Sequence, residues 1–401
     1  MSMPINCVPP VLKGLLSIYQ PSFTKPQFHH FCHLVNGLIV SDNKTLQEIN
    51  DGYGDKDQSS LNRFVSHSDW DLDSLNMVRL QQVKDTLSLK KKGALIIDES
   101  LLHKTGKCME LAGLHRSGIT KKIEWGHMSV NSFYTDSDDN DFPVKTDIYV
   151  REKDCNKNKL DFKTKREIAI EQIDFALQAG LPIGLAIVDA GYEGEEFTRE
   201  LLLRNLDFII GVRVSTNVSV NRQKRISVGQ YLERLTDTDF KTHITDKQSY
   251  FYHITKVSIR GIGAVKLIIS YIDGDEENVK CYITNLDQPD EIIIKLLIKR
   301  WIIECFHRDA KQHLGLEAYQ VRKGRGMQVV ALAILTAYTL VILAARILKT
   351  PIRALRTIGE VCRYLQLIAY KGVRWFKARL KDSVGFVKIL KKNVFVKTAK
   401  V

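Results

Sequence analysis

The sequence predicts an α/β protein with a helical region at its N-terminal end and a β-rich stretch before its last third. Short apolar runs typical of buried strands alternate with amphipathic helices between about residues 90 and 214. Residues 1–88 instead show helical spacing with polar caps and turns. Residues 215–288 contain strand-like runs separated by turns such as GIG and DGDEEN, which predicts an all-β stretch. With 401 residues, 44% of them hydrophobic, the chain can bury one large core or the cores of two to three domains.

Five strand-like and two helical segments make up the predicted α/β region. KKKGALIIDES predicts a buried strand that ends at Asp98, and EWGHMSVNSFYT (124–135) and PVKTDIYV (143–150) predict two more. TKREIAIEQIDFALQAG is typical of an amphipathic helix with a capping-box start and a glycine stop. LPIGLAIVDAGY predicts a buried strand that ends at Asp189. GEEFTRELLLRN then predicts a helix, and DFIIGVRV (207–214) predicts a strand.

A helix that begins at Pro289 is predicted to concentrate ionisable side chains on one face. At about 100° per residue, this face carries Arg300, Glu304, His307, Arg308 and Lys311. The opposite face carries Ile298, Trp301, Ile302, Cys305 and Phe306, with Asp309 as a polar exception. We therefore expect the apolar face to pack on the sheet. Trp301 is expected to be a core residue rather than a side chain that stacks on nucleic acid, and Glu304 is expected to project from a basic stripe.

Three acids in this pattern have the chemistry of a phosphodiester-cleaving site. Asp98 and Asp189 follow predicted strands at their carboxyl ends, where open α/β sheets bind ligands, and Glu304 adds a third carboxylate. Phosphodiester cleavage needs charge stabilised on the attacking and the leaving oxygen, which two Mg²⁺ ions about 4 Å apart supply. Mg²⁺ prefers oxygen ligands. The alternatives are turn capping by each aspartate and surface pairing of Glu304 with Arg300 and Arg308.

Positive charge gathers at the C-terminal end of the chain. The net charge is +13, and residues 351–401 hold thirteen Lys or Arg against two acids, which is 13 − 2 = +11 and leaves +2 for residues 1–350. Such a segment favours a polyanion partner, most often nucleic acid. A solvated tail and a membrane-surface segment are the alternatives.

The remaining features of the composition point to a reducing compartment. The seven cysteines form no CxxC pair, which disfavours a disulfide framework or zinc site, and the N-terminus has no signal-peptide pattern. His29, His30 and His33 lie close together without a matching ligand pair, which favours ordinary histidines over a metal site. Residues 329–345 are uncharged over 17 positions, short for a membrane span and equally typical of a buried core helix.

Three blocks of sequence resemble the DDE-type transposases of cut-and-paste insertion sequences. The spacing Arg300-x3-Glu304-x6-Lys311, within ITNLDQPDEIIIKLLIKRWIIECFHRDAKQHLGLEAYQ, matches most of that family's Tyr-x2-Arg-x3-Glu-x6-Lys signature. LIIDESLLHKTGK resembles the first catalytic block and AIVDAGYEGEEF the second. The resemblance covers roughly residues 30–345. The tyrosine position holds Leu297, which cannot contact a terminal phosphate as tyrosine would, so the resemblance leaves open how the DNA ends are handled and whether a hairpin intermediate is used.

The resemblance implies a fold and an arrangement of the chain. It implies a ribonuclease-H-like catalytic core, a mixed sheet flanked by helices, with a β-rich insertion before the glutamate helix. We expect a helical DNA-binding region, a first core part, the insertion, a second core part and a basic tail, over residues 1–88, 89–214, 215–288, 289–350 and 351–401. Residues 329–345 would then form a core helix, with no membrane involved.

The resemblance also implies roles for individual residues. Asp98, Asp189 and Glu304 would be catalytic and bind two Mg²⁺ ions, with Mn²⁺ as a substitute. Further residues are expected to bind DNA, four of them in the tail: Arg300, Lys311, Arg308, His307, Arg374, Lys377, Arg379 and Lys381.

The implied function is a DNA transposase. It would cut at terminal inverted repeats and join the 3′-OH ends to target DNA, as a homodimer, in a prokaryotic cytoplasm at the nucleoid. One alternative is a transposase-derived protein that binds DNA without cutting. A second alternative is a membrane-associated basic protein built on residues 329–345.

Overall fold

The computed structural model describes most of the chain. The described residues are 4–54, 58–118, 120–221, 223–348 and 357–370. The chain divides into two compact units, and each is described by itself. The helical unit comprises residues 1–88, 101–128 and 306–401, and the sheet unit comprises residues 89–100 and 129–305.

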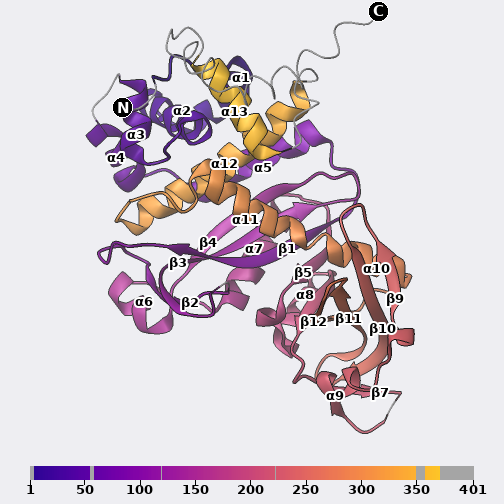
Figure 1. The fold of residues 1–401 in the computed structure, drawn as a ribbon. Coiled ribbons are helices and arrows are strands. Elements are labelled where there is room, and N and C mark those ends of the chain that lie inside the picture. Colours follow the sequence, from indigo (N-terminus) through magenta and orange to yellow (C-terminus); the bar gives the residue numbers. More distant parts are fainter. Residues whose placement is uncertain (1–3, 55–57, 119, 222, 349–356, 371–401) are drawn as a thin grey trace, which may run out of the picture. The chain divides into compact units, whose positions relative to one another are not determined.

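Helices dominate the helical unit, as predicted for residues 1–88. Its elements are α1 (Pro10–Leu16), η1 (Ser17–Ser22), α2 (Lys25–Val40), α3 (Leu46–Tyr53), α4 (Gln58–His67), α5 (Leu72–Leu87), β2 (Gly113–Arg116), α12 (Gly324–Ile347) and α13 (Ile358–Ala369). β2 pairs antiparallel with the first part of β3 (Ile123–Thr135). Helix α12 packs against α1, α2, α4, α5 and α13, which makes it the centre of this unit (Figure 1).

Helix α12 contains the apolar run 329–345. By length and composition it is the one helix among the described residues that could cross a membrane, yet 89% of its most apolar window is buried inside the protein. One of its buried polar side chains is bonded within the unit, since Thr339 Oγ1 accepts a hydrogen bond from the buried Arg79 at 2.7 Å. This burial is typical of a core helix and favours that reading over a membrane span.

The sheet unit is built on one mixed sheet. Its strands are β1 (Gly93–His103), β3, β4 (Phe142–Tyr149), β5 (Ile183–Val188), β6 (Asp207–Val212), β7 (Asn217–Val220), β8 (Ile226–Ser227), β9 (Lys241–Ile244), β10 (Ser249–Ile259), β11 (Gly263–Ile272) and β12 (Asp275–Thr284). The strand order is β3-β1-β5-β6-β12-β11-β10-β7-β8, with β4 on β3 and β9 on β10. β1, β5 and β6 are parallel, whereas β6, β12, β11 and β10 pair antiparallel (Figure 1).

Helices connect and flank these strands. They are α6 (Glu152–Asn158), α7 (Lys165–Gln178), η2 (Ala190–Tyr192), α8 (Glu195–Leu203), α9 (Val228–Leu232), η3 (Asp237–Asp239), α10 (Asp290–Ile298) and α11 (Trp301–Leu314), the last of which runs on into the helical unit. The predicted capping box of α7 is confirmed, because Thr164 and Glu167 bond each other's backbone N–H. Gly180 ends the helix region with a φ of 69°, where glycine is favoured.

Two predictions about elements are wrong. Residues 215–288 are not all-β, because α9 and η3 interrupt the strands; the Ser227 and Gln230 capping box starts α9. The helix predicted from Pro289 is two helices, with Lys299 and Arg300 between them.

Helix α11 buries a different face from the one that the helical wheel predicted. Ile303, Phe306, Ala310 and Leu314 are each 0% exposed, whereas Trp301 is 58% exposed. The prediction that Trp301 packs in the core is therefore wrong. The wheel assumed one continuous helix, but the hydrogen bonds from Arg300 N–H to the Leu297 carbonyl and from Ile302 N–H to the Lys299 carbonyl span three residues. Such bonds tighten the turn, so that the phase of α11 as a whole is offset from that of α10. Within α11 the buried face is the one that carries Ile303, Phe306, Ala310 and Leu314, and Trp301 lies away from it.

Candidate active site

Parallel pairing sets Asp98 beside Asp189. Ile97 pairs with Val188 in the register of β1 and β5, so Asp98 and Asp189 occupy the next positions along neighbouring parallel strands. Asp98 does not end its strand as predicted, because β1 continues to His103. Asp98 lies instead just after the last residue of β1 that pairs with β5. It is therefore level with the carboxyl end of β5.

Asp189 is held by the turn that follows β5. Its Oδ1 accepts a hydrogen bond from the Gly191 N–H at 2.8 Å, so the turn-capping role also exists. Gly211 on β6 allows the close approach of this turn, because a β-carbon there would lie 2.6 Å from the Ala190 nitrogen. Sequence reasoning missed Gly211, and its place in a strand interior was the available signal.

Glu304 lies in the first turn of α11 and is paired with Arg300. An Arg300 guanidinium nitrogen donates to Glu304 Oε1 at 2.8 Å, and the two side chains are 20% and 33% exposed. Arg300 also interacts electrostatically with Asp98 and with the buried Tyr282 of β12. The guanidinium therefore lies among the acids and neutralises part of their charge.

The three acids share one electrostatic environment. Burial raises the pKa of Asp98 to about 7, Arg300 opposes that rise, and Asp189 and Glu304 add to it. A carboxyl responds in this way when neighbouring carboxylates crowd it in a poorly solvated place. The structure thus brings Asp98 within electrostatic reach of both Asp189 and Glu304 in the sheet unit.

A second group of ionisable residues adjoins this one. Glu99, next to Asp98, forms an ion pair with Lys165 at the start of α7, and burial raises the pKa of Glu99. Tyr192 is fully buried, and burial together with the carboxylates of Glu99, Asp189 and Asp98 holds its pKa well above the usual range. Sequence reasoning did not identify Lys165 or Tyr192. The position of Tyr192, three residues after Asp189, was a signal for it.

The other predicted DNA-binding residues of α11 lie in the helical unit. Lys311 Nζ donates to the Leu101 carbonyl at 2.9 Å and lies 3.7 Å from a Glu317 oxygen. Arg308 is on the surface, with its side chain 56% exposed. His307 is 9% exposed and so is not on the helix surface as predicted. Its DNA-binding role stays a prediction, as do those of Arg374, Lys377, Arg379 and Lys381, which lie outside the described residues.

The triad fits a divalent cation by donor chemistry. All three side chains offer carboxylate oxygens, which hard cations prefer. Among the described residues no group of three His, Cys, Asp or Glu side chains is gathered closely enough to hold a metal ion. One ion shared by all three carboxylates would therefore need them to lie closer together.

Comparison with known proteins identifies the family. A family profile described as DDE superfamily endonuclease matches residues 19–229, more than half of the chain, and the chain therefore belongs to this family. A second profile, Transposase DDE domain, matches residues 153–340. The two matched ranges together contain Asp98, Asp189 and Glu304.

Similarity to individual proteins is illustrated by a curated relative and a solved structure. The probable transposase for insertion sequence element IS701 of Microchaete diplosiphon is 30% identical over 210 residues, 51% of this chain and 53% of that protein. The chain thus matches about half the length of this relative. The piggyBac transposase, in a cryo-EM synaptic complex with hairpin DNA, is similar at 10% identity with a TM-score of 0.50, over 98% of this chain and 87% of that chain. This likeness supports a ribonuclease-H-like fold, as expected from the sequence.

Proposed function

We propose that the protein is a DNA transposase that cuts at the terminal inverted repeats of an insertion sequence and transfers the 3′-OH ends to target DNA. The observation that carries the proposal is the placing of Asp98 on β1 beside Asp189, the residue that follows the parallel strand β5, with Asp98 in electrostatic reach of Glu304 and Arg300. The transposase descriptions of the relatives support the same substrate class.

In the proposed mechanism Asp98, Asp189 and Glu304 would hold the divalent metal ions. Two divalent ions, Mg²⁺ or Mn²⁺, would stabilise the charge that builds on the attacking and leaving oxygens of the phosphodiester. Arg300 orients the Glu304 carboxylate in the structure at hand. Its guanidinium fork also matches a phosphate, so Arg300 would be able to bind the DNA backbone near the cut. Trp301, beside Arg300 and exposed, offers a surface on which a base can stack.

The partner is double-stranded DNA, and the assembly is a homodimer. The net charge of +13 supports binding to a polyanion. The helices of residues 1–88 would grip the terminal repeats. Two subunits are inferred because joining both ends of one element brings two cutting sites together. We place the protein in the cytoplasm at the nucleoid, where its DNA substrate lies.

The experiment is a plasmid cleavage assay with a charge-neutral variant. The plasmid carries the gene with its native flanks, and the purified protein is added with Mg²⁺. Glu304→Gln should abolish breaks at the repeats while DNA binding in a gel-shift assay stays unchanged. Glu291→Gln, on the exposed side of α10, is the matched control and should cut like the original protein.

Two results would contradict the proposal. Cleavage that survives in the Glu304→Gln variant would show that this acid does not serve the reaction. Salt-sensitive DNA binding by the original protein, without any Mg²⁺- or Mn²⁺-dependent cutting, would instead favour a transposase-derived protein that only binds DNA.

A further inference from the structure

The junction before α11, the helix that carries Glu304, is held by weak backbone hydrogen bonds. Helix α10 ends at Ile298 and α11 begins at Trp301. Across the gap, the Arg300 N–H donates to the Leu297 carbonyl and the Ile302 N–H to the Lys299 carbonyl, both at 3.0 Å. Hydrogen bonds that span three residues have poorer geometry than those of an α-helix. The direction in which α11 leaves the junction therefore needs a second source of support.

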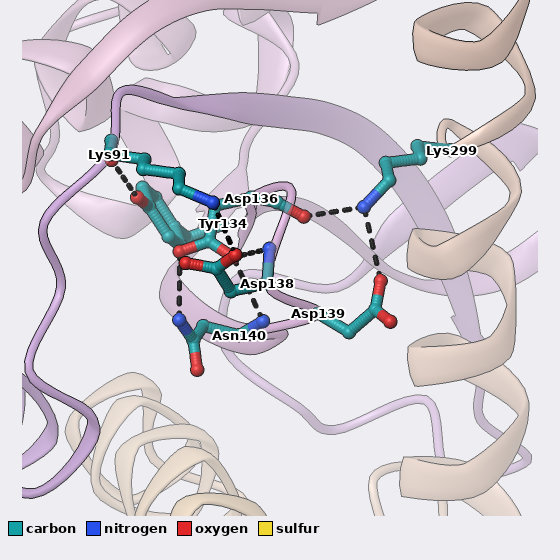
Figure 2. A network of polar contacts seen from close by, with 7 residues as sticks. All are labelled: Lys91, Tyr134, Asp136, Asp138, Asp139, Asn140 and Lys299. Carbon is teal, nitrogen blue, oxygen red and sulfur yellow. Dashed lines mark hydrogen bonds and ion pairs between the residues drawn. The ribbon is translucent and has the colours of Figure 1, made fainter.

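Lys299 supplies a contact from the junction to the turn between β3 and β4. Its Nζ donates to the Asp136 carbonyl at 2.5 Å and to Asp139 Oδ1 at 3.2 Å, as Figure 2 shows. The Asp139 side chain is 82% exposed, and an ion pair in water contributes little. Asp136 is only 3% exposed, so its carbonyl is the acceptor that fixes the ammonium group.

The turn that receives Lys299 is held rigid by Asp136. The Oδ1 atom of Asp136 accepts from the backbone N–H groups of Asp138 at 2.8 Å and Asn140 at 3.1 Å. Its Oδ2 accepts from the Asn140 side-chain amide at 2.9 Å. Asp139, between them, has a φ of 54°, the left-handed region that aspartate tolerates in turns. The carbonyl that binds Lys299 thus belongs to a closed network.

The same turn is tied to the strand that carries Asp98. Lys91 Nζ lies 2.6 Å from Asp138 Oδ1, and the buried Tyr134 hydroxyl donates to the Lys91 carbonyl at 3.3 Å (Figure 2). Tyr134 packs closely on Gly93, the first residue of β1, because a β-carbon there would lie 2.5 Å from its ring. The turn therefore joins the start of the Asp98 strand to the start of the Glu304 helix.

We propose that Lys299 is a positioning residue that sets the direction of the Glu304 helix by binding the Asp136 carbonyl of the β3–β4 turn. The proposal rests on the proposed function, since it assigns a role in orienting one acid of the triad. It explains why a lysine with a carbon stem long enough to reach the turn stands at the junction, directly before Arg300. The residue holds the helix and does not touch the reacting atoms.

A phosphate contact is the competing role for Lys299. Its side chain is 31% exposed, and both acceptors already lie within hydrogen-bond distance. A DNA phosphate would have to displace the carbonyl that fixes α11. The two roles differ in what they change, because a phosphate contact acts on DNA affinity and a positioning contact acts on turnover.

The test compares Lys299→Met, which keeps the stem and removes the ammonium group, with Lys299→Arg. Lys295→Met, an exposed lysine on α10, is the matched control. In the DNA-free protein, hydrogen exchange of the 300–305 amides should speed up roughly tenfold in Lys299→Met alone. In the cleavage assay, its kcat should fall roughly ten- to a hundredfold with KM for DNA within about twofold. Lys299→Arg should retain most of both properties.

Three outcomes would overturn the inference. Unchanged exchange over residues 300–305 in Lys299→Met would show that the contact does not hold the junction. A raised KM with unchanged kcat, and a salt slope smaller by about one, would assign a phosphate contact instead. Faster exchange throughout the sheet unit with unchanged kcat per folded molecule would assign a merely structural role. If Glu304→Gln still cuts DNA, the proposed function fails, whereas the exchange result on DNA-free protein still decides whether Lys299 holds α11.

Discussion

Residues three positions apart on α11 differ in burial and in charge state. Glu304 is 33% exposed on its side chain and bonded to Arg300, whereas His307 is 9% exposed. Burial, with a smaller effect of Lys311, lowers the pKa of His307 to about 3, so its ring is neutral at physiological pH. Among the described residues its Nε2 atom has no hydrogen-bond partner. A neutral buried ring of this kind makes the fold sensitive to acid.

The free energy of unfolding should fall between pH 7 and pH 5 because of His307. Its pKa is about 3 when folded and about 6.5 when unfolded, so the unfolded chain binds more protons in this window. The stability that the neutral ring contributes is present above about pH 6.5 and is lost as the pH falls toward 3. At pH 5 the loss is about 2 kcal/mol, since 1.5 pH units at 1.36 kcal/mol each are involved.

The phenylalanine variant checks this prediction. His307→Phe keeps an aromatic side chain without a titratable group, and urea unfolding at pH 7, 6 and 5 should show about 2 kcal/mol less acid destabilisation than in the original protein. Part of the pH dependence should remain, because burial also lowers the pKa of His127, to about 4. His67→Phe, at an exposed position, is the control. Equal pH slopes for His307→Phe and the original protein would contradict the assignment.

At the scale of elements, the sequence predicts the strands better than the last helices. The strands that carry Asp98 and Asp189 are continuous apolar runs, which mark buried parallel strands, and parallel neighbours place their ends together. No glycine or proline, the residues that usually indicate a helix break, stands at Lys299. Because Trp301, Ile302 and Ile303 are consecutive apolar residues, either helical phase fits the pattern. Only the contacts made by the helix decide between the two.

Residues that act through contacts with partners far away in the sequence could not be predicted from the sequence. Lys165 reaches Glu99 from 66 positions away, and Lys299 reaches Asp136 from 163 positions away. Neither lysine differs from a surface lysine in its local pattern. The acids could be predicted because their types and spacing carry the chemistry. The groups that orient them could not, because register and turn geometry bring them together only in the folded chain.

A buried hydrogen bond joins helix α12 to helix α5, and we expect it to stabilise the helical unit. Arg79 on α5 is 0% exposed and donates to Thr339 Oγ1 at 2.7 Å and to Asn76 Oδ1 at 2.8 Å. Thr339→Val should lower the free energy of unfolding by about 1.5–3 kcal/mol, because a hydrogen bond from a buried charged group is lost. Urea unfolding of the purified protein measures the change.

Thr336 on the same helix is the matched control. Thr336 is also buried, but its hydroxyl donates to the Leu332 carbonyl within α12. When the hydroxyl is removed, the Leu332 carbonyl still accepts its backbone hydrogen bond in the helix. Thr336→Val should therefore cost less than about 1 kcal/mol. Equal losses in the two variants would show that the Arg79 contact has no special weight.

At the scale of the whole molecule, charge separates the C-terminal segment from the rest. Residues 351–401 carry +11 of the total +13. Counterion release makes such a segment a source of DNA affinity that depends on salt and not on sequence. The acids of the triad, by contrast, lie in the sheet unit and are expected to act on the bond that is cut. Affinity and chemistry should therefore be separable by mutation.

Substitution of the four tail residues Arg374, Lys377, Arg379 and Lys381 by glutamine tests that separation. The slope of log Kobs against log salt for duplex DNA should become shallower by up to about 3.6, at roughly 0.9 per phosphate contact. The loss of DNA affinity should be equal for repeat and random sequences, because contacts to the DNA backbone carry no sequence information. The same charge removed at the exposed Lys153, Lys157, Lys159 and Lys163 is the control and should change the slope less. A tail variant that loses its preference for the repeats would show that the tail reads sequence, which contradicts the separation. A tail variant that changes the slope no more than this control would show that the tail does not bind the DNA, and would assign the affinity to the described units.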